Sequence, residues 1–303
     1  MFNKFSLAML FLFSICIFSQ ELYVPRNIKK SYENETRSKD GKPGKNYWQN
    51  AGNYQIEIKV DPTTKIVSGN ETIEYSNNSS DTLKSVVIRF VNNVHKPTSP
   101  RWSKTSTDFL SEGLKIKALS INGENYKVAS ENWETIQDLK LTKAFLPKSK
   151  NEIKIEWEYP LSKESGREGQ IDDTTLFCAY AYPRISVYDD YNGWDKLPHN
   201  GRNEFYNDFN NYDVSVSVPK NYIVYATGVL QNANEVLQPS ILSKFKQSLT
   251  SEEIIHIATK EEIQTQKVTL QNPQNIWKFE AENVTDFTFG TSSSYIWDAS
   301  SVQ

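Results

Sequence analysis

The sequence predicts a mainly β protein with curved antiparallel sheets or a sandwich, and a short helical insertion. Apolar residues alternate with polar ones in many short segments. Turn residues such as Asp61-Pro62 and Asn122-Gly123 separate these segments. Aromatic residues make up 13% of the chain and supply the large side chains that a packed core requires. Neither a glycine-rich phosphate loop nor a regular alternation of strands with helices competes with this prediction.

The clearest strand pattern begins after residue 47. There Tyr54, Ile56, Ile58 and Val60 alternate with polar residues, which is typical of a strand with one face in water. The same period of two, bounded by turn residues, predicts further strands at 66–75, 86–90, 114–118, 139–141, 153–157, 214–218, 222–226, 277–281 and 287–289.

One stretch departs from this pattern. Residues 235–262 carry apolar side chains at helical spacing, and Pro239 stands where a first helical turn would begin. We therefore expect a helical insertion over 235–262.

The N-terminus has the layout of a secretory signal peptide over residues 1–19. Lys4 is followed by an apolar run from 5 to 18 and then by the small residue Ser19. The run is too short for a membrane anchor, and Ile15 before Cys16 does not match a lipid attachment site. We expect export to the periplasm or beyond, without a membrane anchor. After cleavage Cys178 is the remaining cysteine, so no internal disulfide is expected.

Residues 20–45 are polar and charged and are predicted to form a linker. Cationic residues are frequent there, but Glu33, Glu35 and Asp40 dilute them, which disfavours a basic membrane-binding patch. The whole chain has a formal charge of −3 with acidic residues spread along it, so no nucleic-acid partner is expected.

No complete catalytic or metal site is evident. The three histidines, His95, His199 and His256, lack the spacing of a zinc hydrolase site. The chain contains no Gly-x-Ser-x-Gly turn. Cys178 has apolar neighbours, which favours a buried and unreactive thiol. We expect no catalytic residue, no metal ligand and no bound cofactor in this chain, and no activity from it alone.

Residues 177–194 combine four tyrosines, Trp194, Arg184 and the pair Asp189-Asp190. Aromatic rings with an arginine are typical of a recognition edge. A structural Arg–Asp pair beneath an aromatic cluster explains the composition as well, and both interpretations stay open. Adjacent acids on a strand point to opposite faces, so Asp172-Asp173 and Asp189-Asp190 favour turns or strand caps over catalysis.

A series of stretches in this order resembles the N-terminal domain of the M1 family of zinc metallopeptidases, the aminopeptidase N group. The likeness is greatest to secreted forms of Bacteroidetes-type bacteria. It spans residues 46 to 303 and is carried by residues 47–50, 54–56, 69–73, 182–190, 193–194, 204–206, 212–228, 281–287 and 297–301.

The resemblance implies a saddle-like β domain over 46–296 that packs on a zinc-binding catalytic domain. Residues 297–303 would then begin that catalytic domain, which holds the zinc and is missing here. The resemblance also implies a peptide substrate in the full-length protein. The chain would be the non-catalytic, substrate-side part of a secreted aminopeptidase.

The resemblance implies substrate-binding roles for residues of the central motif. Tyr180, Tyr182 and Arg184 would line the substrate cleft, and Asp189 and Asp190 would orient Arg184 or the neighbouring loop. In the family a Gln or Glu four residues before the motif arginine binds the substrate's amino group. This chain has Tyr180 there, whose ring could contact an ammonium only through a cation–π interaction.

The alternative is a stand-alone secreted β-sandwich that binds polysaccharide or a protein partner. Such a module would use the same aromatic cluster without any enzyme chemistry.

Overall fold

The structure of this protein, a computed structural model, describes residues 23–128 and 134–302. The chain divides into two units, residues 1–47 and residues 48–303. The predicted signal peptide, residues 1–19, lies outside the described residues.

The first unit contains a helix within the predicted linker. Helix α2 (Arg26–Glu33) is followed by a loop that folds back on it. Thr36 Oγ1 donates to the backbone oxygen of Ser31 at 3.1 Å. The backbone N–H of Gly44 donates to the backbone oxygen of Thr36 at 2.9 Å. A Cβ atom on Gly44 would lie 2.0 Å from the Glu35 oxygen, so this close approach requires glycine. Backbone contacts, rather than an apolar pattern, shape this segment.

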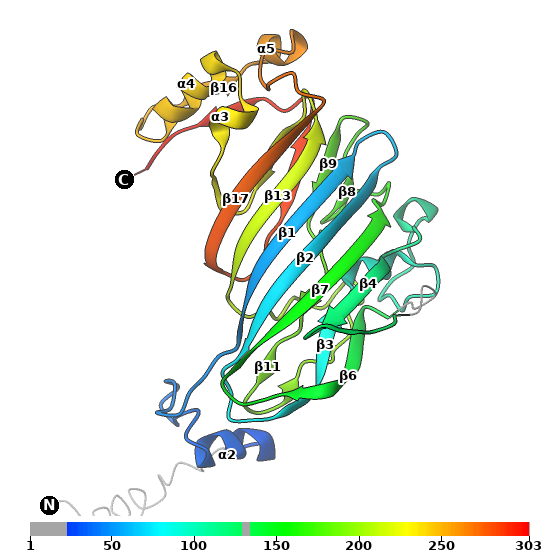
Figure 1. Cartoon of the computed structure of the whole chain (residues 1–303), viewed down its shortest axis with the longest axis vertical. Coiled ribbons are helices and arrows are strands. Elements are labelled where there is room, and N and C mark those ends of the chain that lie inside the picture. The colour runs from blue at the N-terminus through cyan, green and yellow to red at the C-terminus, as the bar shows by residue number, and fades with distance from the viewer. Residues whose placement is uncertain (1–22, 129–133, 303) are drawn as a thin grey trace, which may run out of the picture. The chain divides into compact units, whose positions relative to one another are not determined.

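The second unit is built on an eight-stranded sheet (Figure 1). Its strands, in spatial order, are β15 (Val229–Leu230), β17 (Gln274–Val284), β13 (Asn210–Pro219), β1 (Ala51–Asp61), β2 (Ile66–Asn77), β7 (Ser149–Pro160), β4 (Lys115–Ile121) and β5 (Glu124–Asn125). Among these described strands, β1 and β13 form a parallel pair that places Tyr54 opposite Tyr212, and the other neighbours are antiparallel.

Smaller sheets complete the second unit. They comprise β10 (Arg184–Ile185), β3 (Leu83–Arg89) and β6 (Ile136–Phe145); β14 (Ile223–Ala226), β18 (Phe289–Ser292), β9 (Thr175–Cys178) and β8 (Gly169–Gln170); β11 (Tyr188–Asp189) with β12 (Gly193–Trp194); and β16 (Ile255–Ala258) with β19 (Trp297–Ala299). Two 3-10 helices, η1 (Val91–His95) and η2 (Thr107–Phe109), lie in the connections. These antiparallel sheets confirm the predicted mainly β fold class.

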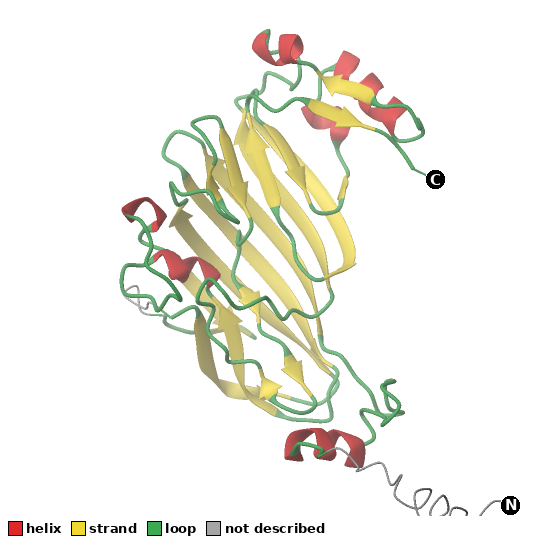
Figure 2. Ribbon diagram, turned by 180° about the vertical axis from the view of Figure 1, so that it is seen from behind, coloured by secondary structure: helices red, strands yellow, loops and turns green. Residues whose placement is uncertain are grey.

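The core lies between the long sheet and the smaller elements. Figure 2 shows the short strands and 3-10 helices covering one face of the long strands. On that face Ile56, Ile73, Trp157 and Trp277 are fully buried. Along each strand, the residues that alternate with the buried ones point to the opposite face, which is polar and open to water. The alternation of apolar and polar residues in the sequence therefore corresponds to the buried and the exposed face of this sheet.

The stretch 235–262 contains short helices but is not wholly helical. It holds the second half of α3 (Ala233–Val236), all of α4 (Pro239–Ser248), and the first residues of α5 (Lys260–Gln264). Pro239 opens α4, where its missing N–H is not needed. Strand β16 also lies inside the stretch and pairs with β19, a partner distant in sequence that helical spacing could not reveal.

Candidate functional site

The segment 177–194 runs from the end of β9 through β10 to the β11–β12 hairpin. Strand β10 pairs with β3 and places Arg184 opposite Arg89. Arg89 in turn is paired with Asp195. The backbone N–H of Ile185 also donates to the phenol oxygen of Tyr54 in β1 at 3.1 Å, so the segment contacts the buried face of the main sheet.

Tyr182 and Arg184 are buried there, 1% and 3% exposed. Arg184 Nη1 donates to Asp286 Oδ2 at 2.7 Å, and the phenol of Tyr182 donates to Asp286 Oδ1 at 2.9 Å. The Tyr182 oxygen also lies 3.0 Å from that of Tyr212. Burial opposes the charge of Arg184, but Asp286, together with Tyr182 and Tyr212, outweighs this effect and the pKa of Arg184 is raised. A structural Arg–Asp pair therefore sits beneath the aromatic cluster.

The partner of Arg184 differs from the acids considered in the sequence. Asp286 follows β17, and the pairing of β17 with β13 brings it to the segment. Asp189 does not contact Arg184. Its Oδ1 accepts the backbone N–H groups of Tyr191 at 3.1 Å and Asn192 at 2.7 Å, which closes the β11–β12 turn. Asp189 therefore stabilises the neighbouring turn, one of the two roles expected for it, and its part in substrate binding stays a prediction.

Asp190 lies in the same β11–β12 turn and is half-buried. The turn is anchored by its aromatic residues. Trp194 Nε1 donates to the backbone oxygen of Ser85 at 3.0 Å, and the rings of Tyr188 and Trp194 meet edge to face at 5.2 Å. The turn, and Asp190 with it, is consequently fixed to the edge of β3.

Tyr180 occupies a different place, beside a cavity of about 140 Å³. Its ring packs 5.8 Å from His199 and 5.2 Å from Phe205, and the residue is 7% exposed. The guanidinium of Arg184 lies 5.3 Å from the centre of the Phe205 ring. Phe205 therefore connects the cavity beside Tyr180 with the buried Arg184 cluster.

A buried carboxylate forms the wall of this cavity. Glu168 Oε2 accepts the backbone N–H of Tyr180 at 3.1 Å, and Glu168 Oε1 accepts the side-chain amide of Asn92 at 3.0 Å. His95 Nε2 lies 3.0 Å from the same oxygen, while His95 Nδ1 donates to the backbone oxygen of Phe109 at 2.8 Å. Glu168 thus determines where the backbone of Tyr180 lies.

His199 also lines this cavity, as a neutral ring. Burial, assisted by the positive charges of Arg89, Arg184 and Arg167, lowers the pKa of His199 to about 4. At neutral pH it contributes an uncharged aromatic surface, stacked 4.7 Å from Phe205.

Sequence reasoning missed Glu168, Phe205 and Asp286 as members of this site. Glu168 and Asp286 stand alone in the sequence, without the paired acids that mark acid–base chemistry. Phe205 and Asp286 lie within stretches 204–206 and 281–287 of the family resemblance, which was the available signal for these two residues. His95 was considered only as a metal ligand, whereas its contacts are with Glu168 and Phe109.

The residues present do not fit a metal site. Over residues 23–128 and 134–302, no group of three or more His, Cys, Asp or Glu side chains could hold a metal ion. Cys178 is buried, and burial raises its pKa well above the ordinary value, so it is not a thiolate nucleophile. Within the same residues no helix is long and apolar enough to cross a membrane.

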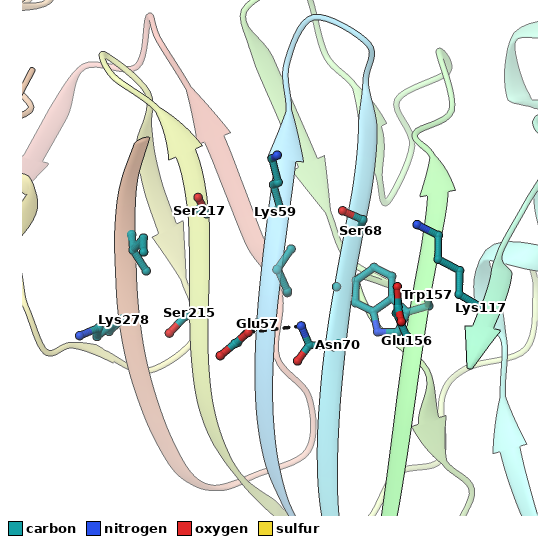
Figure 3. Close-up of a pocket in the computed structure, with 13 residues that line it drawn as sticks. Glu57, Lys59, Ser68, Asn70, Lys117, Glu156, Trp157, Ser215, Ser217 and Lys278 are labelled. Carbon is teal, nitrogen blue, oxygen red and sulfur yellow. Dashed lines mark hydrogen bonds between the residues drawn. The ribbon is translucent and has the colours of Figure 1, made fainter. Parts of the chain in front are cut away.

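A larger hollow of about 790 Å³ lies on the open face of the main sheet (Figure 3). Polar side chains surround it, including Glu57, Lys59 and Lys117, and Asn70 Nδ2 donates to Glu57 at 3.2 Å. Trp157 lies at its floor but is 0% exposed. Among its lining residues no aromatic ring is therefore exposed for a sugar to stack on.

Comparison with known proteins gives a partial likeness. No family model matches the chain, and no curated protein matches it. A point mutant of the M1 zinc metallopeptidase from Deinococcus radiodurans has 13% identity and a TM-score of 0.43, covering 83% of this chain and 44% of that one. The same mutant bound to a Tyr-Ser-Ala substrate has 13% identity and a TM-score of 0.42, covering 80% and 42%. The chain spans less than half the length of these structures, and values this low do not establish a family.

Proposed function

We propose that this chain is the substrate-side, non-catalytic N-terminal domain of an exported M1-type zinc aminopeptidase. One observation carries the proposal. Stretches that resemble this family separately in the sequence converge on one cluster: Arg184 and Tyr182 from 182–190, Tyr212 from 212–228 and Asp286 from 281–287. Unrelated local matches would have no reason to meet in space.

In this proposal the cluster positions the site and Tyr180 touches the substrate. Tyr182 and Arg184 are too deeply buried to contact a peptide directly. They hold the segment that carries Tyr180, and Asp189 holds the adjoining turn. Tyr180 lies beside a cavity and presents an aromatic ring, which contacts a peptide amino group by cation–π attraction.

The zinc belongs to a catalytic domain that this proposal places outside the described residues. When bound there, it would activate the water that attacks the peptide bond. The role of the present chain is to bind and orient one side of the substrate. Export rests on the predicted signal peptide of residues 1–19.

The stand-alone binding module receives less support from the geometry. A polysaccharide module needs an array of exposed aromatic rings, but Tyr182 is 1% exposed and Tyr180 lines a cavity of only about 140 Å³. The hollow on the open face of the main sheet is bordered by polar and charged side chains such as Glu57, Lys59 and Lys117. No specific observation favours this second function.

The test begins with the purified chain of residues 20–303 and an aminoacyl arylamide substrate. We expect no chelator-sensitive hydrolysis from this chain alone. We expect hydrolysis once the chain is joined to a His-Glu-x-x-His domain encoded downstream in the same reading frame. In that longer protein Tyr180→Ala should raise KM several-fold, while Tyr23→Ala, an exposed control, should not. Zinc-dependent activity of residues 20–303 alone, or unchanged kinetics in Tyr180→Ala, would contradict the proposal.

A further inference from the structure

Arginine side chains gather around the cavity of about 140 Å³ in the candidate site. Arg167 lines this cavity, and its side chain is 60% exposed. Gly201, which is exposed, lines it as well and is followed in the chain by Arg202. Arg101 donates to the backbone oxygen of Val94, another lining residue, at 2.9 Å. We call Arg101, Arg167 and Arg202 the arginine rim.

The loop that carries Arg202 is fixed by hydrogen bonds. Asn200 Oδ1 accepts the backbone N–H of Arg202 at 3.0 Å, and the backbone oxygen of Asn200 accepts that of Trp102 at 3.1 Å. The guanidinium of Arg202 lies 4.0 Å from the centre of the Trp102 ring, which is 67% exposed. An arginine stacked on an aromatic face keeps the N–H groups at the edge of its plane free to bind a carboxylate. Arg202 is therefore an oriented donor beside the cavity.

The positive charge of the rim is only partly balanced by carboxylates. Arg167 pairs with Glu204 at 3.1 Å, and both side chains are exposed. Arg101 donates to three backbone oxygens rather than to an acid. Among the residues that the structure describes, Arg202 has its contact with Trp102 and no carboxylate partner. Arginine keeps its charge at every physiological pH, so two of the three cations lack an acid of their own.

The two carboxylates that line the cavity have donors outside the rim. Glu168 is buried and accepts the backbone N–H of Tyr180 and the side-chain amide of Asn92. Glu164 accepts the hydroxyl of Ser106. An acidic group that approaches from water therefore meets exposed arginine donors, of which Arg167 alone is engaged by an acid.

We propose that the arginine rim selects substrates that carry a carboxylate close to their amino end, with Arg167 and Arg202 as specificity-determining residues. This selection rests on the proposed function, in which Tyr180 contacts the substrate's amino group. Because Arg167 lines the same small cavity as Tyr180, a carboxylate on the first or second residue meets the rim. The carboxylate of the substrate then replaces Glu204 at Arg167. It comes from an acidic side chain or from the C-terminus of a dipeptide.

The first test measures the binding of two peptides to residues 20–303 by NMR titration at low salt. Glu-Ala-Ala amide and Gln-Ala-Ala amide differ in one charge and hardly in size. We expect the Glu peptide to bind about fivefold more tightly, as one partly exposed ion pair would allow. Amide shifts should concentrate at residues 167 and 199–204. The difference should shrink at high salt, because salt screens exposed charges.

A second pair of peptides identifies the source of the carboxylate. Ala-Ala with a free C-terminus and Ala-Ala amide differ only at that terminus. A preference for the Glu peptide in the first pair assigns the carboxylate to an acidic side chain. A preference confined to the free dipeptide assigns it to the C-terminus. Either result supports selection by the rim, whereas equal affinities within both pairs would overturn it.

Variants show whether the rim is responsible. Arg167→Gln and Arg202→Gln should each reduce the preference for the charged peptide, and the double variant should abolish it. Lys59→Gln is the matched control, because it removes the same charge from the open face of the main sheet. A preference that survives in the double variant, or that falls equally in Lys59→Gln, would overturn the proposal.

Glu204 supplies a test of opposite sign. Glu204→Gln releases Arg167 from its present partner and should strengthen binding of the charged peptide several-fold. Glu57→Gln, at an exposed acid on the open face of the main sheet, removes the same charge and should not. Weaker or unchanged binding in Glu204→Gln would contradict the exchange of carboxylates at Arg167.

Kinetics in the longer protein with its catalytic domain separate this selection from the proposed function. If the side chain is the source, Arg202→Gln should raise KM for a glutamyl arylamide and leave KM for an alanyl arylamide and both kcat values unchanged. The binding tests need no catalytic domain. Charge preference without any hydrolysis would refute the peptidase proposal alone. Hydrolysis that depends on Tyr180 but shows no charge preference would refute only the selection by the arginine rim.

Discussion

The guanidinium of Arg184 meets the carboxylate of Asp286 at 2.7 Å in the protein interior, although 102 residues separate them in the sequence. The same carboxylate accepts the phenol of Tyr182 and the backbone N–H of Phe287. Asp286 therefore joins segment 177–194 to the connection between β17 and β18.

Removing this carboxylate should be strongly destabilising. In Asp286→Ala the buried charge of Arg184 loses its partner, and we expect the free energy of unfolding to fall by about 3–5 kcal/mol. Urea unfolding followed by tryptophan fluorescence measures this. The exposed pair of Arg167 and Glu204 supplies the control, and Glu204→Ala should cost less than about 1 kcal/mol. Equal losses in both variants would contradict the view that Asp286 compensates a buried cation.

Glu168 should be essential for the cavity beside Tyr180. Glu168→Ala leaves the backbone N–H of Tyr180, the amide of Asn92 and the ring of His95 without their acceptor. We expect a loss of about 3 kcal/mol or more, because buried donors would be left unsatisfied. Glu164→Ala is the matched control, since Glu164 lines the same cavity but is exposed. A wild-type unfolding midpoint for Glu168→Ala would show that the carboxylate is not needed there.

His199 should make the protein less stable in acid. Its pKa is lowered to about 4 in the folded state, below the ordinary value of about 6.5. Between these values the unfolded chain binds more protons, so stability should fall as the pH decreases from about 6.5 to 4, by on the order of 3 kcal/mol. His199→Phe keeps the aromatic contact and should remove this part of the pH dependence. The control variant His256→Gln, at an exposed histidine, should leave this pH dependence of stability unchanged.

Asp208 should make the protein less stable as the pH rises, which is the opposite of the effect of His199. Burial, with a smaller effect of Asp189, raises its pKa to about 7. Here the folded protein binds the extra proton, so stability should fall as the pH rises from about 4 to 7. Asp208→Asn should therefore be more stable than wild type at pH 8, by about 2–4 kcal/mol, and similar at pH 4. Urea midpoints at the two pH values measure the difference. A variant that is destabilised equally at both values would refute the assignment.

Much of the main sheet could be predicted because each long strand carries its own signal. Alternation such as Tyr54, Ile56 and Ile58 depends only on which face of a strand is buried. The short strands β8, β10, β11 and β12 could not be predicted in this way. Each has two residues, too few for a period, and exists only because a partner strand supplies hydrogen bonds.

The site was predicted only in outline. The sequence marked segment 177–194 as unusual and left open whether Arg184 served recognition or paired with an acid. The structure pairs it with Asp286, an acid in stretch 281–287 of the family resemblance that nothing in the sequence linked to Arg184. The burial of Glu71 in β2, 2% exposed, could not be predicted either, because an acid within a strand usually faces water.

The sequence by itself determined the mainly β class and the aromatic character of segment 177–194, since composition and alternation are local properties. Only the tertiary structure decided that Tyr180 lies at a cavity while Arg184 pairs with Asp286 in the interior. The physical reason is that burial and charge balance depend on which strands become neighbours. In this sheet those neighbours, such as β1 with β13, come from distant parts of the chain.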